Sequence, residues 1–549
     1  MSAFAATVRR GGGWLPMIGL LSVVDAAGQL ALPAALGRCV DAVVAGHDLG
    51  PWVAAVAGLI VVSVVADVLD AYAGAACVSR TTAWLRDTLV RHTLAVGPSG
   101  ANRFDTGDLV SRICANSADA AQAGPAVVVV GTALIPPIGS LVLLALIDPW
   151  VAAAFLAGLA LVAGVLRAFT RTTARVTGAY QQVQARIAAR LAESLAGART
   201  IAGAGTLLAE RRRVLGPLAE LRAHGDRTWH ALSRSSAQAA VVGPLVLVAV
   251  LAAGGLGALT GRITPGELFA ASRYAVLGAG LGALTGALGR LARARAGVAR
   301  AAEVLGVEPL RYGSRTLPDR CPGGRLELRD VTVRAGAARL LDGVNLTVPA
   351  GALVAVVGRS GSGKSTLAAI ATRLRDPDAG EVLLDDVPMA DLSHDALRAA
   401  VGCAFERPTL VGHTVADALG DNLHRVRAAA GATHAHDFIS RLPDGYATPL
   451  ARTPLSGGET QRLGLARAWP ARRLLVLDDA TSSVDIVTGM RIASALASGR
   501  GARTTVVVTH RPTAAAGADL VVWLAAGSVR AVAPHADLWP DPDYRAVFA

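Results

Sequence analysis

Long runs of apolar residues recur through the first half of the chain. Each run is long enough, at about 1.5 Å per helical residue, to cross a hydrocarbon core of about 30 Å. We therefore predict six membrane-spanning helices. They lie near residues 14–36, 52–76, 125–147, 151–169, 237–259 and 268–288.

The segments between some of these runs are polar and periodic. Residues 185–213 place apolar side chains three and four positions apart, opposite arginines, which is typical of an amphipathic helix. We expect two long excursions of this kind to continue the spans outside the membrane.

From about Pro309 the pattern changes to short apolar runs separated by polar residues and glycines, which indicates alternating strands and helices. The sequence thus predicts a multidomain chain. A six-helix, all-α transmembrane domain occupies residues 1–308, a linker residues 309–324, and an α/β P-loop NTPase domain residues 325–549.

Composition supports a membrane-embedded portion, since 52% of the residues are hydrophobic and 17% are charged. The net charge is +12, but the arginines flank apolar runs and form no aromatic-interleaved patch, so nucleic-acid binding is not expected. The cysteines form no CxxC pair and have no histidine at metal-ligand spacing, so neither a zinc site nor a disulfide framework is predicted. They are Cys39, Cys77, Cys114, Cys321 and Cys403.

The arginines also predict an orientation, because positively charged flanks stay in the cytoplasm. Twelve lie in residues 167–234 and five in residues 80–112. The connections near residues 37–51, 147–150 and 260–267 carry only Arg38 and Arg262. We expect a multi-pass protein of the cytoplasmic (inner) membrane, with both termini and the nucleotide domain in the cytoplasm.

Polar residues inside two of the spans are unusual. Asp25 and Gln29 share a face of the first span, and Asp67 and Asp70 share a face of the second. Because acids are costly in a membrane, they often line a polar cavity. The alternative is that they cap or bridge helices.

The stretch GALVAVVGRSGSGKSTLAAIATRL reads as a strand, a glycine-rich loop and a helix, the order of a phosphate-binding loop. Its backbone N–H groups and helix N-terminus would face phosphate oxygens, Lys364 would reach the β and γ phosphates, and the Ser365 hydroxyl would bind Mg²⁺. Lys364 is the only lysine in the chain. The predicted nucleotide-binding residues here are Gly358, Arg359, Ser360, Gly361, Ser362, Gly363, Lys364, Ser365 and Thr366.

The apolar run LLVL ends at Asp478, a carboxylate placed to hold Mg²⁺ beside a phosphate loop. These two features predict a P-loop NTPase that binds ATP and Mg²⁺. In LSGGETQRLGLARA, Ser456 and Glu459 form a capping box at the start of a helix, and Gly457 and Gly458 leave its N-terminus open to a phosphate.

With this signature the chain resembles an ABC transporter half of the exporter type over essentially its whole length. ATSSVD resembles the D-loop, and His510 in VVVTHRP resembles the switch histidine. The resemblance implies two nucleotide domains that close head to tail on two ATP molecules, each signature completing the partner's site. It also implies that a loop near residues 96–113 docks on the nucleotide domain, and that residues near 202–213 form a second docking loop.

Three positions depart from the family pattern. Asp479 stands where a glutamate that orients water is expected, and Glu406 stands at the Q-loop glutamine, where it can still meet Mg²⁺. Ala335 replaces the aromatic residue that stacks on adenine. A displaced general base lowers a rate by roughly 10²–10⁴-fold. Asp479, His510 and Glu406 are the candidate catalytic residues, and Ser365, Asp478 and Glu406 the candidate metal ligands.

The chain's own ATP site is thus predicted to bind ATP and hydrolyse it poorly, while its signature serves a competent site on a second ABC half-transporter. We therefore predict a heterodimer of two different half-transporters. The alternative is a homodimer in which the aspartate supports slow ATP hydrolysis. We expect ATP-driven export of a peptide, a lipid or an amphipathic metabolite from a bacterial cell. The alternatives are an ATP-clamp regulatory subunit and an importer of iron chelators with the exporter fold. The sequence does not identify the substrate.

Overall fold

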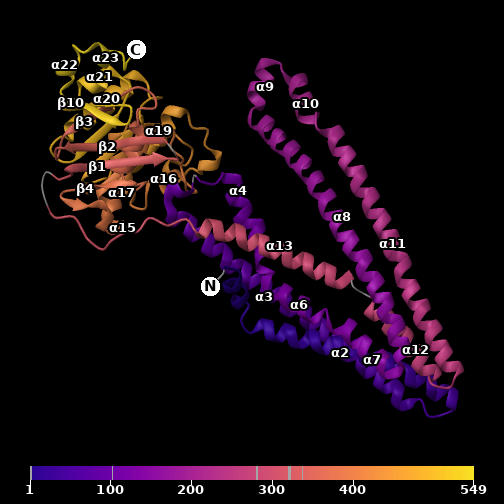
Figure 1. The fold of residues 1–549 in the computed structure, drawn as a ribbon. Coiled ribbons are helices and arrows are strands. Elements are labelled where there is room, and N and C mark those ends of the chain that lie inside the picture. Colours follow the sequence, from indigo (N-terminus) through magenta and orange to yellow (C-terminus); the bar gives the residue numbers. More distant parts are fainter. Residues whose placement is uncertain (1–2, 102, 280–281, 320–322, 337, 549) are drawn as a thin grey trace. The chain divides into compact units, whose positions relative to one another are not determined.

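The computed structural model describes residues 3–101, 103–279, 282–319, 323–336 and 338–548 (Figure 1). The chain forms two compact units. The first comprises Met1–Val90 and Thr106–Gly306, and the second comprises Arg91–Asp105 and Val307–Ala549. Cys321 and part of the expected linker lie outside the described residues.

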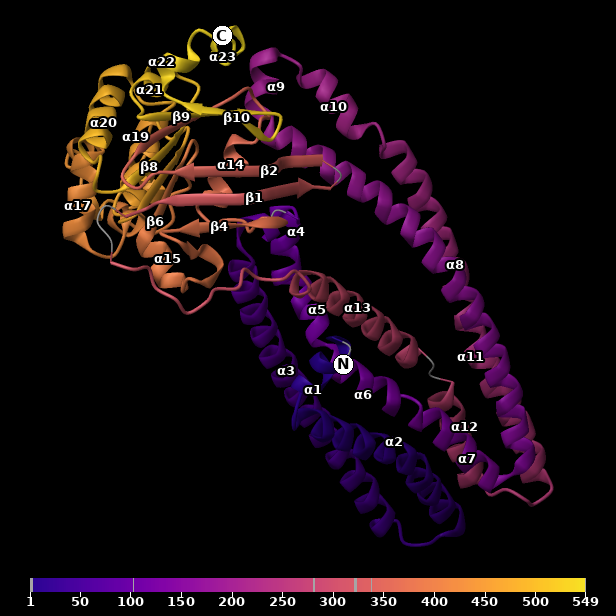
Figure 2. The same ribbon diagram turned by 60° about the vertical axis from the view of Figure 1, so that its left-hand side comes forward.

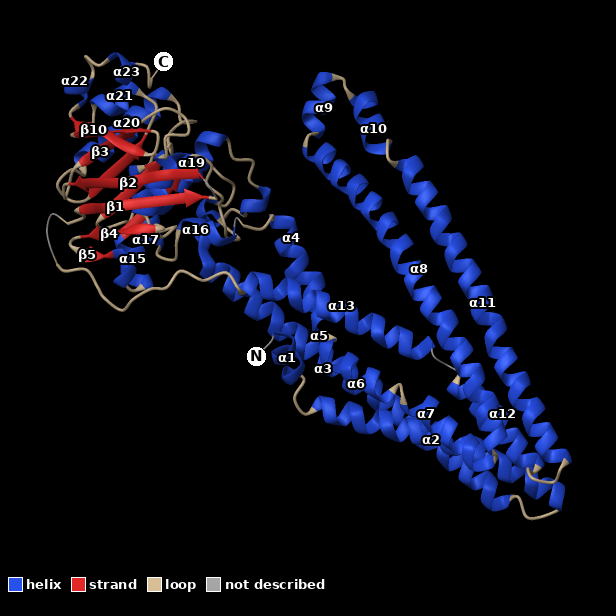
Figure 3. Cartoon of the chain, in the orientation of Figure 1, coloured by secondary structure: helices blue, strands red, loops and turns tan. Residues whose placement is uncertain are grey.

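The described residues of the first unit form helices joined by loops, with no strand among them (Figure 3). Two long helices, α8 and α11, run side by side and carry two short helices at their far end (Figures 1 and 2). The helices are α1 Ala3–Arg10, α2 Trp14–Ala45, α3 Gly50–Ala101, α4 Thr106–Ser111, α5 Ser117–Ala121, α6 Ala123–Thr132, α7 Ile135–Ile147, α8 Pro149–Ala196, α9 Ala198–Ala204, α10 Leu207–Leu215, α11 Leu218–Leu259, α12 Pro265–Gly278 and α13 Gly282–Leu305.

The expected spans fall on these helices with two differences. The third is divided between α6 and α7, because Pro136 and Pro137 at the start of α7 cannot continue the preceding helix. The sixth is divided between α12 and α13, on either side of residues outside the description. The described residues hold three helical stretches long and apolar enough to cross a membrane, and the count of six stays a prediction. They are Trp14–Ala45, Gly50–Pro98 and Thr106–Ile147, with shorter apolar helices at Pro149–Leu161 and Gly243–Leu259.

An apolar core joins α7, α8, α11 and α12. It includes Leu144, Phe155, Val250 and Tyr274, which are almost completely buried. The Tyr274 hydroxyl donates to the carbonyl of Leu30 at 2.8 Å, so its polar end is satisfied on α2. This core packs the apolar ends of the two long helices together.

The second unit contains two sheets. The four-stranded sheet has the order β2-β1-β4-β5 and is antiparallel; the six-stranded sheet has the order β10-β9-β3-β8-β7-β6 and is parallel except at β10. The strands are β1 Leu326–Ala335, β2 Ala338–Val348, β3 Leu353–Val357, β4 Ala379–Leu384, β5 Val387–Pro388, β6 Val401–Phe405, β7 Leu474–Asp478, β8 Thr504–Val508, β9 Leu520–Ala525 and β10 Ser528–Ala533.

Helices accompany this parallel sheet, as the alternating pattern predicts. They are α14 Lys364–Ala371, α15 His394–Ala400, α16 Val415–Leu419, α17 Leu423–Ala432, α18 His436–Ile439, α19 Gly457–Ala468, α20 Ile486–Ser498, α21 Pro512–Ala516, α22 His535–Leu538 and α23 Pro542–Arg545.

The parallel strands bring the candidate site together. β3, β6, β7 and β8 run in the same direction, so their carboxyl ends meet at one edge of the sheet. The phosphate loop follows β3 and Glu406 follows β6, while Asp478 ends β7 and His510 lies two residues after β8. Ligands of open α/β sheets bind at this edge.

Candidate nucleotide site

The phosphate loop connects β3 to α14, and two of its glycines are required by its shape. A side chain at Gly358 would come within 2.4 Å of the Leu524 carbonyl. Gly363 has φ +99°, and a side chain there would meet the Leu340 carbonyl at 2.7 Å. The loop can curl only because these positions lack side chains.

Polar groups of the loop fit phosphate oxygens. Lys364 Nζ donates to the carbonyls of Gly358 and Arg359 at 2.7 and 3.0 Å and therefore arches over the loop. The Ser362 hydroxyl is buried and has no hydrogen-bond partner among the described residues, so an anionic oxygen in the loop would satisfy it. Burial lowers the pKa of Lys364, against the opposing effect of two nearby aspartates.

The remaining predicted residues of the loop lie around this arch. Arg359, Ser360 and Gly361 are exposed on it, and Thr366 lies in the first turn of α14.

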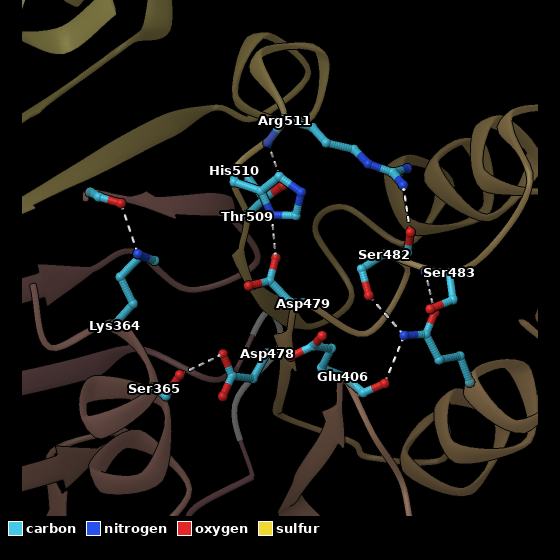
Figure 4. A network of polar contacts seen from close by, with 12 residues as sticks. Lys364, Ser365, Glu406, Asp478, Asp479, Ser482, Ser483, Thr509, His510 and Arg511 are labelled. Atoms are coloured by element: carbon cyan, nitrogen blue, oxygen red, sulfur yellow. Dashed lines mark hydrogen bonds and ion pairs between the residues drawn. The ribbon is translucent and has the colours of Figure 1, made fainter. Parts of the chain in front are cut away.

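Ser365 and Asp478 meet as the sequence predicts for Mg²⁺ ligands. Ser365 Oγ donates to Asp478 Oδ1 at 3.2 Å (Figure 4). Burial raises the pKa of Asp478, the Ser365 hydroxyl opposes this, and the Asp479 carboxylate adds to it. In the described residues no three histidine, cysteine or acidic side chains form a metal cage. Mg²⁺ is usually held by one or two protein oxygens together with substrate phosphates, and the Ser365 hydroxyl and the Asp478 carboxylate could supply such oxygens.

Asp479 lies beside His510. His510 Nδ1 and Asp479 Oδ1 are 3.1 Å apart (Figure 4). The backbone of Asp479 is left-handed, with φ +49°, a conformation that aspartate tolerates better than most residues. The short carboxylate is therefore held to the histidine at the turn that ends β7.

Glu406 follows β6 at the same edge, with its side chain exposed. Its carbonyl accepts a hydrogen bond from Gln461 Nε2 at 2.7 Å. Gln461 also donates to Ser482 Oγ at 2.9 Å and accepts from the Ser483 N–H at 2.8 Å.

Gln461 belongs to the signature, which is predicted to serve a site on the partner, yet its side chain is buried and faces inward. It ties the Glu406 loop to the loop after Asp479. Its position five residues after Ser456 in the signature is the sequence signal for this role.

The signature forms the capping box that the sequence predicts. Ser456 Oγ accepts from the Glu459 N–H at 3.3 Å, and Glu459 Oε2 accepts from the Ser456 N–H at 2.9 Å. The backbone hydrogen bond lowers the pKa of Glu459. Ser456 and Gly457 are exposed, and Gly458 is half-buried, so the N-terminus of α19 is open to an external group.

Ala335 ends β1 and pairs with Ala338 across the hairpin. The backbone of the neighbouring Arg334 makes two hydrogen bonds. Its N–H donates to Asp378 Oδ2 at 2.6 Å, and its carbonyl accepts from Arg375 at 2.6 Å. No aromatic ring stands at this position.

Comparison with known families matches both halves of the chain. A family model described as "ABC transporter transmembrane region" matches residues 15–278, and one described as "ABC transporter" matches residues 341–482. The chain is also 46% identical over 535 residues to "ABC transporter ATP-binding protein RamA" of Streptomyces coelicolor, covering 96% of this chain and 84% of that protein. The chain is an ABC transporter half of the exporter type.

Other relatives of this half-transporter are more distant. The "ATP-dependent lipid A-core flippase" of Bordetella pertussis is 29% identical over 500 residues, 88% of this chain and 80% of that protein. The fold matches a solved structure titled "Structure of a bacterial Atm1-family ABC exporter with ATP bound", with a TM-score of 0.79, 24% identity and coverage of 98% and 97%. The half-transporter is therefore a multi-pass membrane protein with an ATP-binding domain, and a transport-coupled ATPase.

Proposed function

We propose that this half-transporter pairs with a different half-transporter and exports a peptide, a lipid or an amphipathic metabolite across the cytoplasmic membrane. Its own site binds ATP with Mg²⁺ but hydrolyses it poorly, and most turnover occurs where its signature meets the partner's phosphate loop. Both termini and the nucleotide domain lie in the cytoplasm.

One observation carries this proposal. The phosphate loop and the Ser365–Asp478 pair are complete, whereas the residue expected to orient water is an aspartate held to His510. Its carboxylate is one methylene shorter than that of a glutamate and reaches less far from the turn. Catalysis by a general base depends on hydrogen-bond distance to the reacting proton, so binding is retained and hydrolysis is weakened.

The test measures ATP hydrolysis at this site alone. A tag on this chain is used to purify its complex from the membranes of the cells that naturally produce it. In that complex the partner's phosphate-loop lysine is replaced by alanine, so that any remaining hydrolysis occurs at the Lys364 site. Asp479→Glu should raise this residual rate by about tenfold or more, a part of the 10²–10⁴-fold attributed to general-base positioning. Asp479→Asn is the matched control, and it should leave the slow rate nearly unchanged.

A wild-type residual rate comparable to that of the intact complex, lost in Asp479→Asn, would contradict an impaired site. Mass spectrometry of the tagged complex identifies the partner, and recovery of this chain alone as a dimer would contradict the heterodimer.

Transport direction needs its own assay. A relative 38% identical over 244 residues, which cover 43% of this chain and 42% of that protein, is named "Mycobactin import ATP-binding/permease protein IrtB". In inside-out membrane vesicles the nucleotide domains face the bath. ATP-dependent accumulation of substrate in such vesicles supports export, and ATP-dependent loss of preloaded substrate supports import.

A further inference from the structure

A cluster of arginine and aromatic side chains lies at one end of the apolar parts of α2 and α3, in the first unit. Trp14 is the first residue of α2, and Arg80 follows the apolar part of α3. Trp14 packs edge-on against Tyr72 of α3, with ring centroids 6.3 Å apart. Tryptophan and tyrosine are enriched where spanning helices meet the polar surface of a membrane. The cluster therefore stands at the level of lipid headgroups.

Two arginine–tryptophan pairs cross in this cluster. The Arg10 guanidinium lies over the Trp84 ring, 5.1 Å from its centroid. The Arg80 guanidinium lies over the Trp14 ring at the same distance. Arg80 and Trp84 are one helical turn apart on one face of α3. Arg10 ends α1 and Trp14 begins α2, so the two guanidinium groups flank a single patch of the surface.

The turn between α1 and α2 is built to hold Arg10 in this position. Gly12 has φ +52°, a left-handed conformation that glycine adopts without strain, and its N–H donates to the Arg9 carbonyl at 3.1 Å. Helix α1 itself packs on α6 and α13, with Thr7 buried (Figure 2). The crossed pairs therefore belong to a packed part of the first unit.

The two arginines carry uncompensated positive charge. Arg10 and Arg80 are exposed, and neither has a carboxylate partner in the part of the chain that the structure describes. Stacking on a tryptophan ring orients the plane of each guanidinium and leaves the N–H donors at its edge available. Such oriented donors match the oxygens of a phosphate group, which guanidinium binds through paired hydrogen bonds.

Toward the middle of the two helices, large apolar side chains are exposed. Leu20 of α2 and Val68 of α3 are each 64% exposed, and Met17 and Val23 of α2 are also exposed. In a membrane such side chains contact acyl chains. The first unit thus offers a basic end and an apolar face, which is the pattern that a phospholipid with a negatively charged headgroup matches.

We propose that Arg10 and Arg80 bind the phosphate of an anionic phospholipid, whose acyl chains lie along the exposed apolar side chains of α2 and α3. Basic sites at the ends of spanning helices recognise anionic headgroups in this way. The bound lipid would link α1, α2 and α3 at the membrane surface. This inference goes beyond the proposed function and does not depend on the chemistry at Asp479.

Native mass spectrometry of the detergent-solubilised full-length chain tests the site. The chain is titrated separately with phosphatidylglycerol, which is anionic, and with phosphatidylcholine, which has no net charge. One phosphatidylglycerol should be retained at a roughly tenfold lower lipid concentration than phosphatidylcholine. Arg10→Gln with Arg80→Gln should remove this preference, because both guanidinium groups are lost. Equal retention of the two lipids by the wild type overturns the inference.

Two further variants separate a built site from general attraction to positive charge. Arg10→Lys with Arg80→Lys keeps both charges but loses the planar fork, and it should lose most of the preference. Arg38→Gln is the matched control, because Arg38 lies over the Trp52 ring, 5.9 Å from its centroid, at the opposite ends of α2 and α3. This variant should keep the preference. A preference that survives in the lysine variant, or that Arg38→Gln also removes, overturns the inference.

Inorganic phosphate distinguishes a lipid from a free anion, since both offer the same oxygens. An excess of inorganic phosphate should not displace phosphatidylglycerol, because it lacks acyl chains to contact the apolar face. Displacement would overturn the assignment to a lipid. Thermal unfolding gives a second measurement: phosphatidylglycerol should raise the melting temperature of the wild type more than phosphatidylcholine does, and this difference should vanish in Arg10→Gln with Arg80→Gln.

The same preparations are photolabelled with azido-ATP, with Lys364→Ala as the negative control. Labelling of the arginine variants shows that their nucleotide domains are folded. Labelled wild type without a preference for phosphatidylglycerol refutes the lipid site and leaves the proposed function standing. Loss of labelling in a wild type that keeps the lipid preference refutes the proposed function and leaves the lipid site standing.

Discussion

Asp478 and Asp479 are adjacent, but their carboxylates have different surroundings. Asp478 ends a strand and is partly buried, with the Ser365 hydroxyl as its donor, whereas Asp479 turns toward His510. Burial penalises an ionised carboxylate and raises the pKa of Asp478, so ionising this group in the folded protein costs stability. Mg²⁺ held by Asp478 and Ser365 beside bound nucleotide would offset this cost.

Asp478→Asn tests this trade-off. A carboxyl group whose pKa is raised on folding contributes stability below its unfolded pKa, and this contribution is lost as the pH rises through the folded pKa. At neutral pH the uncharged amide should therefore raise the melting temperature without nucleotide by about 2 °C, on the scale where about 1 kcal/mol moves a domain by about 2–4 °C. It should also remove the stabilisation by ATP that depends on Mg²⁺.

Differential scanning fluorimetry across acidic to neutral pH measures both effects. In the wild type, Mg²⁺-dependent stabilisation should weaken as the pH falls toward the raised pKa of Asp478, because the proton and the metal compete for the same oxygen. Asp485→Asn is the control, since the pKa of Asp485 is lowered by its helix-capping hydrogen bonds and that variant should be destabilised instead. A lower melting temperature in Asp478→Asn would contradict the account.

At the scale of elements, the N-terminus of α19 is the part of the signature that is open to an external group. Its capping box leaves Ser456 and Gly457 exposed, while residues farther along the helix, including Leu463 and Leu465, are buried where the helix contacts β6 and α17. The hydroxyl of Ser456 therefore has a structural role within the helix and, if the partner closes on it, a role in the partner's site.

Ser456→Ala should separate these roles in the tagged complex. Loss of the cap should cost about 1 kcal/mol of stability. ATP turnover by the complex should fall at least tenfold, while azido-ATP labelling at Lys364 in this chain should persist. Thr414→Ala is the matched control, because Thr414 caps α16 with a similar box and it should cost stability but not turnover. Equal losses of turnover in the two variants would mean that capping alone explains the effect.

The element order was predictable because its signals are local. The S-x-x-E pattern predicted the capping box at Ser456, and the run ending at Asp478 predicted the strand that presents it. The break before α7 was not predicted, although Pro136 and Pro137 are a local signal for it. The left-handed backbone of Asp479 and the inward turn of Gln461 were not, because both depend on loops that are far apart in the sequence.

At the scale of the whole molecule, the chain is one half of an ABC transporter. A helical membrane unit and an ATP-binding unit lie on one polypeptide, and the family places each signature against another chain's nucleotide. The signature residues, which this chain would present to another chain, keep the residue types that are typical of the family. The residue that would act on this chain's own nucleotide has a side chain one methylene shorter than the usual glutamate. That imbalance is the central reason to expect two unlike halves.

ATP hydrolysis by the full-length chain, purified without any other half-transporter and reconstituted in lipid, tests this claim most directly. The account predicts a rate near background that Asp479→Asn leaves unchanged, although azido-ATP still labels the Lys364 site. Brisk hydrolysis by a dimer of this chain alone, abolished by Asp479→Asn, would contradict it.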